Sequence, residues 1–148
     1  MKNTNLSYYS ENEEKVNYIT SLIGLSISVI GFILLISFAY YYGTALHIVC
    51  CAIYGLTMIF MYVCSTFYHG VENGKYKSFF RLLDHSSIFL YIAGSYTPFT
   101  LINLKGAWGW SIFSIVWFLA ILGIVLRIIF RTKASTITMV LYILMGWT

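Results

Sequence analysis

Two polar clusters stand out in an otherwise apolar chain, and their residue types are those of metal-assisted hydrolysis. The first is the run STFYH from Ser65 to His69, and the second is the run DHSS from Asp84 to Ser87. A neutral imidazole is a common ligand for zinc, and a nearby carboxylate can hold or deprotonate a metal-bound water. His69 and Asp84 therefore suggest half of a hydrolytic zinc site.

Helical spacing gathers these polar groups on shared faces. Ser65 and His69 are four residues apart, so a helix stacks them on one side. The connection from His69 to Asp84 is short, which predicts that their two helices are antiparallel neighbours. A polar stripe follows Asp84 at helical spacing and should face the bundle interior, because lipid would not solvate it. Its members are Ser87, Tyr91, Ser95 and Pro98.

A structural interpretation of the same residues stays open at this point. Asp84 could cap the third helix through its side-chain oxygen, and His69 could lie hydrated at the membrane surface. His85 lies about 100° around the helix from Asp84, and we expect it to make interfacial or interhelical hydrogen bonds. We expect His47, at the opposite end of its helix, to be structural.

The composition of the chain is that of a membrane protein. Apolar residues make up 59% of the 148 residues and charged residues only 9%, whereas soluble domains are about one-quarter charged. The apolar runs are about twenty residues long, which favours membrane-spanning helices over the short alternating strands of a barrel. We predict an all-α, polytopic transmembrane helix bundle that forms a single membrane domain over residues 1–148.

The boundaries of the apolar runs predict the order of the spans. Residues 1–16 are polar and lack the pattern of a cleavable signal peptide, so we expect a short tail followed by an uncleaved anchor. Complete spans are expected at about 18–40, 45–68, 85–104 and 108–130. A fifth run, 134–148, has about fifteen residues at ~1.5 Å each and is too short to cross a ~30 Å hydrocarbon core.

The basic residues predict the orientation of these spans. Lys105 lies alone on one side, so the positive-inside rule places the N-terminus and the 70–84 loop in the cytoplasm. The net charge of +4 is then explained by the orientation of the protein in the membrane and by contact with anionic membrane lipids. We therefore expect no nucleic-acid partner. The other eight basic residues are Lys2, Lys15, Lys75, Lys77, Arg81, Arg127, Arg131 and Lys133.

The segments STFYHG and RLLDHSSIFLYIAGSYTPF resemble the signature of the hemolysin III proteins, the bacterial relatives of the progestin and adipoQ receptor (PAQR) membrane proteins. The resemblance covers nearly the whole chain, including EEKVNYITSLIG, HIVCCAIYG and the pair Gly146 and Trp147. It implies a multi-pass protein of the bacterial cell membrane whose seven-helix bundle holds zinc near the cytoplasmic side.

The resemblance also implies roles for three residues. His69 matches the first zinc ligand, Asp84 a base beside the metal-bound water, and Ser65 a group that orients water or an oxyanion. Two further histidines are expected from an H-x-x-x-H motif in the last span. The implied activity of the full-length form is zinc-dependent hydrolysis of the amide of a long-chain lipid.

Two departures from the family pattern bear on that activity. Ser21 stands where the pattern Asn-x-x-Thr-His, around Asn17 and Thr20, has its histidine. The H-x-x-x-H motif does not occur within the 148 residues. Catalytic zinc usually takes three protein ligands, and this sequence supplies His69 as one strong candidate.

Three other functions stay open on the sequence. A cytolytic, pore-forming protein would use the polar stripe of the third helix to line a water path. A receptor-like protein would hold a structural zinc without turning over any lipid. A truncated, inactive fragment would have no complete site of its own.

Overall fold

The computed structural model describes residues 10–71, 75–129 and 135–147, and its described secondary structure is entirely helical. The prediction of an all-α transmembrane bundle is thereby confirmed. In chain order the elements are α1 (Glu11–Tyr42), α2 (Ala45–Gly70), α3 (Lys75–Pro98), the π-helix η1 (Phe99–Leu104), α4 (Gly106–Ile129) and α5 (Ser135–Trp147).

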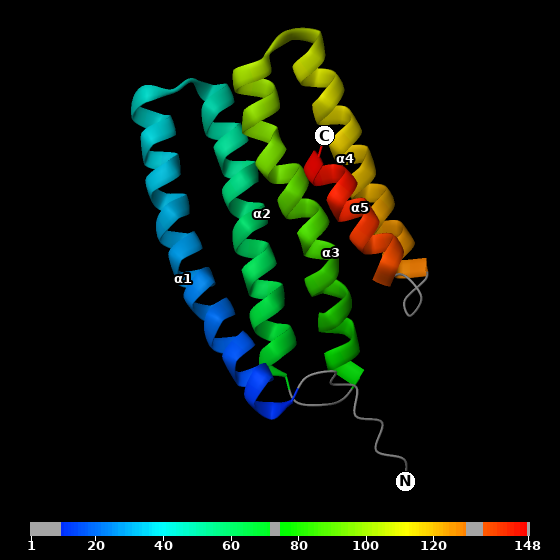
Figure 1. Ribbon diagram of the computed structural model, residues 1–148. Coiled ribbons are helices and arrows are strands. Elements are labelled where there is room, and N and C mark those ends of the chain that lie inside the picture. Colours follow the sequence, from blue (N-terminus) through cyan, green and yellow to red (C-terminus); the bar gives the residue numbers. More distant parts are fainter. Residues whose placement is uncertain (1–9, 72–74, 130–134, 148) are drawn as a thin grey trace.

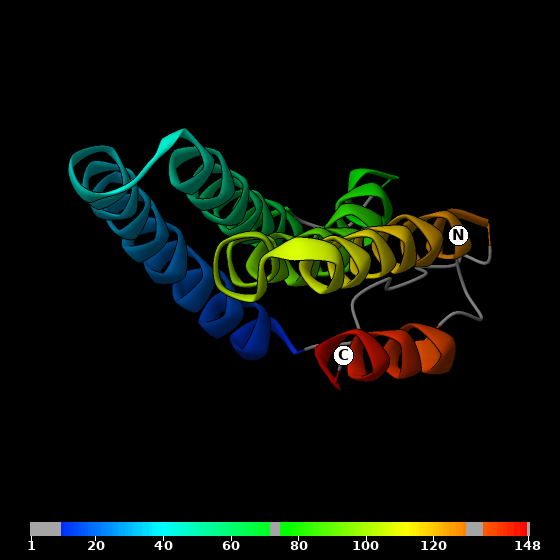
Figure 2. The ribbon, with the colours of Figure 1, turned by 90° about the horizontal axis from the view of Figure 1, so that it is seen from above.

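Consecutive helices pack against one another. Helix α2 lies between α1 and α3, α4 packs on α3, and α5 contacts both α3 and α4, as Figures 1 and 2 show from two directions. The start of α1, the end of α2 and the start of α3 lie together at the bottom of Figure 1. We call this the His69 end of the bundle.

Helix α1 begins earlier than the predicted span because a capping box fixes its first turn. The backbone N–H of Ser10 donates to Glu13 Oε2 at 2.7 Å, and the backbone N–H of Glu13 donates to Ser10 Oγ at 3.4 Å. This reciprocal arrangement satisfies two amide groups that a helix start otherwise leaves unpaired. Residues 11–16, which we assigned to a polar tail, are therefore helical, and Glu14 joins the bundle.

Helix α3 begins at Lys75, ten residues before the predicted span. Asp84 consequently lies more than two turns inside the helix, where a capping side chain has no terminal amide to bind. The interpretation of Asp84 as a helix cap is wrong. Its carboxylate is instead held on the side of a continuous helix, facing the neighbouring elements.

The end of α3 changes its winding at Pro98. Proline lacks an amide hydrogen and crowds the preceding turn, and the chain continues as the π-helix η1. Threonine hydroxyls lie at this change: Thr97 Oγ1 donates to the carbonyl of Ala93 at 2.9 Å and Thr100 Oγ1 to that of Tyr96 at 2.8 Å. Local side chains thus support the backbone around the proline.

Among the described residues, three helices are long and apolar enough to cross a membrane, namely α1, α2 and α4. Helix α3 does not meet the same measure, since its first turns carry Lys77, Arg81 and Asp84. Its crossing and the exact limits of all spans stay predictions. Helix α5 has 13 residues and is about 20 Å long at ~1.5 Å per residue, so this helix is shorter than a bilayer core.

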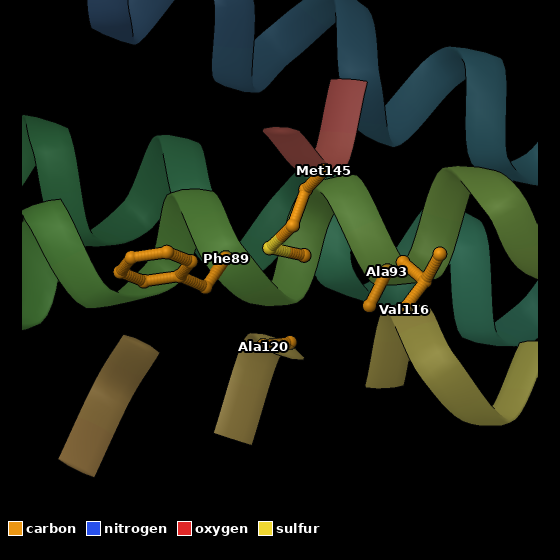
Figure 3. Close-up of a cluster of buried hydrophobic side chains, with 5 residues drawn as sticks. All are labelled: Phe89, Ala93, Val116, Ala120 and Met145. Atoms are coloured by element: carbon orange, nitrogen blue, oxygen red, sulfur yellow. The ribbon is translucent and has the colours of Figure 1, made fainter. Parts of the chain in front are cut away.

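The best-packed region lies where α3, α4 and α5 meet. Phe89, Ala93, Val116, Ala120 and Met145 are fully buried there, as Figure 3 shows. Glycine completes the contact, because a Cβ atom on Gly123 of α4 would collide with the ring of Phe89 on α3. Small residues at such a position let two helices approach closely in a membrane, where packing drives association.

This close approach predicts a cost for enlarging Gly123. Gly123→Ala should lower stability by about 1–3 kcal/mol, the usual range for overpacking a filled site, and should lower the Tm in detergent. Gly31→Ala is the matched control, since a Cβ on Gly31 meets nothing within 4 Å and alanine favours helix by up to ~1 kcal/mol. Equal Tm shifts for the two variants would contradict the packing described.

Candidate functional site

One carboxylate joins three helices at the His69 end. Glu14 on α1 places Oε2 at 2.8 Å from His69 Nδ1 on α2, and Oε1 at 3.0 Å from Lys77 Nζ on α3. The three side chains are largely buried, with exposed fractions of 14%, 10% and 5% in the same order. Glu14 is therefore an interior bridge and not a surface charge.

The contact with Glu14 determines which ring nitrogen of His69 can act as a ligand. An ionised carboxylate only accepts hydrogen bonds, so Nδ1 of His69 carries the hydrogen and donates it to Glu14. The lone pair of the neutral ring then lies on Nε2. Carboxylate–histidine pairs of this kind orient metal-ligating histidines in many proteins. The interpretation of His69 as a hydrated surface residue is wrong.

Lys77 is compensated on two sides. Besides its ion pair with Glu14, its ammonium lies 4.9 Å from the centroid of the Tyr68 ring, and Tyr68 is 2% exposed. A buried ammonium is costly unless it is paired, and an aromatic face adds a cation–π attraction. The first turns of α3 are thereby fixed to α1 and α2.

Ser65 forms a second polar link between the same helices. Its hydroxyl lies 2.9 Å from the hydroxyl of Ser21 on α1, and its side chain also interacts with the Asp84 carboxylate on α3. The resemblance to hemolysin III proteins implies a histidine at the position of Ser21. The substitution keeps a polar contact to Ser65, although with a much smaller side chain.

Asp84 lies between the two histidines of this end. Its carboxylate interacts electrostatically with both His69 and His85, and the side chain is 16% exposed. His85 Nδ1 is 3.6 Å from Asp84 Oδ2, which is too long for a hydrogen bond, and it bonds instead to the carbonyl of Arg81 at 2.8 Å. The expected interhelical bond of His85 is made by its backbone carbonyl, which accepts from Tyr142 of α5.

The structure thus brings Ser65, His69 and Asp84 to one end of the bundle, held by α2 and α3. An imidazole and a carboxylate are donor types that zinc accepts. Within residues 10–71, 75–129 and 135–147, however, no group of three or more His, Cys, Asp or Glu side chains is arranged to hold a metal ion. The donor pair fits zinc in kind and supplies part of a coordination set, so the ligand and catalytic roles stay predictions.

Sequence reasoning missed Glu14 and Lys77 because both were assigned to loops. A signal for Glu14 is present, since the S-x-x-E pattern from Ser10 to Glu13 is a helix-start signature that extends α1 over Glu14. Glu14 and Ser21 are then seven residues apart, which places them on one helix face. No comparable pattern marks Lys77, whose burial depends on how α3 packs.

The polar stripe of α3 is largely satisfied by its own helix. Ser87 Oγ donates to the carbonyl of Asp84 at 2.6 Å, and Ser95 Oγ donates to that of Ile92 at 2.8 Å. The ring of Tyr91 stacks on Tyr54 of α2 with centroids 6.2 Å apart. These groups need no water path to be accommodated in the bundle.

The chain is similar to bacterial proteins that carry the name Hemolysin-3. Hemolysin-3 of Bacillus cereus is 43% identical over 135 residues, which cover 91% of this chain and 62% of that protein. The Hemolysin-3 homolog of Bacillus subtilis strain 168 is 40% identical over 139 residues, covering 94% and 65%. The chain therefore spans less than two thirds of the length of these curated relatives. No solved structure matches it.

The sequence pattern described as haemolysin-III related matches residues 9–148. This range contains every helix described above, together with Ser21, Ser65, His69 and Asp84. The match and the two relatives agree on the same group. The chain belongs to the haemolysin-III related family.

Proposed function

We propose that this chain contributes His69, Asp84 and Ser65 to the zinc centre of a membrane-embedded hydrolase of long-chain lipid amides. The observation that carries the proposal is the buried Glu14–His69 pair, with Nδ1 and Oε2 2.8 Å apart, beside the Asp84 carboxylate. A carboxylate bonded to one ring nitrogen fixes the tautomer and the orientation of the ring, as the outer-shell partners of metal-ligating histidines do.

Each of the three residues has a distinct role in this proposal. His69 binds the metal through Nε2, and Asp84 orients the attacking water and accepts its proton on the carboxylate. Ser65 donates from its hydroxyl to Asp84 or to the carbonyl oxygen of the amide as negative charge develops on it. When bound, zinc supplies Lewis acidity and lowers the pKa of water.

The proposal requires more ligands than the described residues supply. Catalytic zinc usually has three protein ligands, and this chain covers 62–65% of the two relatives' lengths. The hydrolase proposal accordingly concerns the product of the complete gene. Sequencing the source DNA past codon 148 tests it first, because an in-frame H-x-x-x-H supports the proposal and a stop codon opposes it.

We also propose a location and an orientation. In the sequence, eight of the nine basic residues fall around the start of α1, the connection between α2 and α3 or the end of α4, and the ninth, Lys105, lies between η1 and α4. By the positive-inside rule the side of these eight residues is the cytoplasm, and the membrane is the bacterial plasma membrane. The hydrolytic site then opens toward the inner leaflet.

The name of the relatives favours a second function, membrane permeabilisation, since both are called Hemolysin-3. A pore would require the polar stripe of α3 to face water. The hydroxyls of Ser87 and Ser95 instead bond within their own helix. The contacts of the described residues therefore favour the hydrolase.

His69 is expected to determine zinc content. His69→Ala in the detergent-purified product of the complete gene should lower bound zinc at least tenfold by elemental analysis, since a three-ligand site loses one ligand. His47→Ala is the matched control, because His47 contacts Thr44 Oγ1 at 2.8 Å at the far end of α2. Unchanged zinc in His69→Ala would exclude the ligand assignment.

Glu14 is expected to set zinc affinity through the His69 tautomer. Glu14→Gln should weaken zinc binding about 10–100-fold, the usual effect of losing an outer-shell carboxylate, as measured by competition with a chelator. Glu13→Gln is the control, because Glu13 is exposed and serves the N-cap. Lys77→Met tests whether a loss of packing alone would weaken zinc binding. This variant loses the ion pair with Glu14 and keeps the Glu14–His69 contact, so it should lower the Tm and leave the zinc affinity within about threefold of the wild type. Equal losses of affinity in Lys77→Met and Glu14→Gln would refute this role.

Asp84 is expected to act in the chemical step. Asp84→Asn should reduce hydrolysis of a long-chain N-acyl lipid in liposomes about 10²-fold or more, in line with the loss of a general base, and zinc should stay bound. Release of a trapped dye is measured in parallel with and without a chelator. Chelator-insensitive leakage without hydrolysis would favour a pore, and bound zinc without turnover would favour a receptor.

A further inference from the structure

Arg127 is a buried cation without a counterion among the described residues. It lies near the end of α4 with 6% of its surface exposed, and its Nε–H has no hydrogen-bond partner within the described ranges of the chain. No ion pair joins it to any carboxylate in the part of the chain that the structure describes. Such an arrangement is rare, since a guanidinium is always charged and its burial is costly unless paired.

The groups around Arg127 do not neutralise it. Arg81 of α3 and Tyr142 of α5 are close enough to interact with it electrostatically, and His85 of α3 also interacts with it. The hydroxyl hydrogen of Tyr142 is directed to the carbonyl of His85. Two guanidinium groups and an imidazole thus interact between α3, α4 and α5. The Asp84 carboxylate lies 3.6 Å from His85 Nδ1 and makes no ion pair with Arg127 among the described residues.

A negatively charged ligand would compensate the buried charge of Arg127. Guanidinium groups bind oxyanions in a forked geometry with two parallel hydrogen bonds. Basic pockets between membrane helices commonly hold the head groups of anionic lipids. In the sequence, Arg131 and Lys133 come four and six residues after Arg127 and add positive charge to this part of the chain.

We propose that Arg127, together with Arg81, binds a phosphate-type oxyanion between α3, α4 and α5, presented by the head group of an anionic lipid. A lipid suits the position, because α4, which carries Arg127, is long and apolar enough to cross a membrane. Free phosphate has the same chemistry and is the alternative source. The proposal does not depend on zinc or on the hydrolase activity, since neither arginine belongs to the proposed catalytic set.

Thermal unfolding in detergent tests the site. Dioctanoyl phosphatidylglycerol should raise the Tm of the chain more than dioctanoyl phosphatidylcholine does, because ligands of the folded state stabilise it. Arg127→Met should require at least tenfold more phosphatidylglycerol for half of the maximal shift. Without added lipid its Tm should be unchanged or higher, since replacing an uncompensated buried charge by a hydrophobe is often stabilising.

Two further variants and one further ligand complete the test. Arg127→Lys keeps the charge and loses the fork, so its half-maximal concentration should lie between those of the wild type and Arg127→Met. Lys105→Gln, at an exposed residue beyond η1, is the control and should behave as the wild type. Sodium phosphate, compared with sodium chloride at equal ionic strength, should shift the Tm less than the lipid.

Each remaining outcome has a defined meaning. A full shift with sodium phosphate alone supports the oxyanion site and assigns it to free phosphate. An equal response of Arg127→Met and the wild type to phosphatidylglycerol overturns the proposal. A sharp fall in the Tm of Arg127→Met without any anion also overturns it, because Arg127 would then have a partner within the protein.

Discussion

The Glu14 carboxylate is the interaction on which the His69 end of the bundle depends. It binds His69 of α2 and Lys77 of α3 with its two oxygens, at 2.8 and 3.0 Å. These three side chains are largely buried, so water does not compensate their charges. Each charge is therefore stabilised by the other members of the bridge. The bridge therefore does two things at once: it fixes three helices in register and gives the imidazole of His69 a single tautomer.

The sequence predicted much of this architecture because a membrane restricts the choices. Long apolar runs and polar positions at helical spacing predicted an all-α bundle, and the structure places Ser65, His69 and Asp84 at one end of it. It could not predict where α1 and α3 begin. The start of α1 depends on the Ser10 cap, and the start of α3 depends on the burial of Lys77. A hydropathy profile assigns both of these polar residues to loops.

The same limit explains the errors about Asp84 and His69. Hydropathy places a charged residue outside a span, and a charged residue just before a span looks like a cap. Helix α3 instead continues from Lys75 through Asp84, because Glu14 and the Tyr68 ring compensate the lysine of its first turn. The pairing of a charge with residues on other helices depends on the tertiary structure, so residue spacing and composition do not predict it.

Charge is compensated unevenly across the bundle. On the side formed by α1, α2 and α3, the ammonium of Lys77 meets a carboxylate. On the side formed by α3, α4 and α5, Arg127 is buried without one among the described residues. Tyr142 interacts electrostatically with both Arg127 and Asp84, so the two regions share this residue. The hydroxyl of Tyr142 donates to the backbone carbonyl of His85 on α3, so this residue also ties α5 to the helix that carries Asp84.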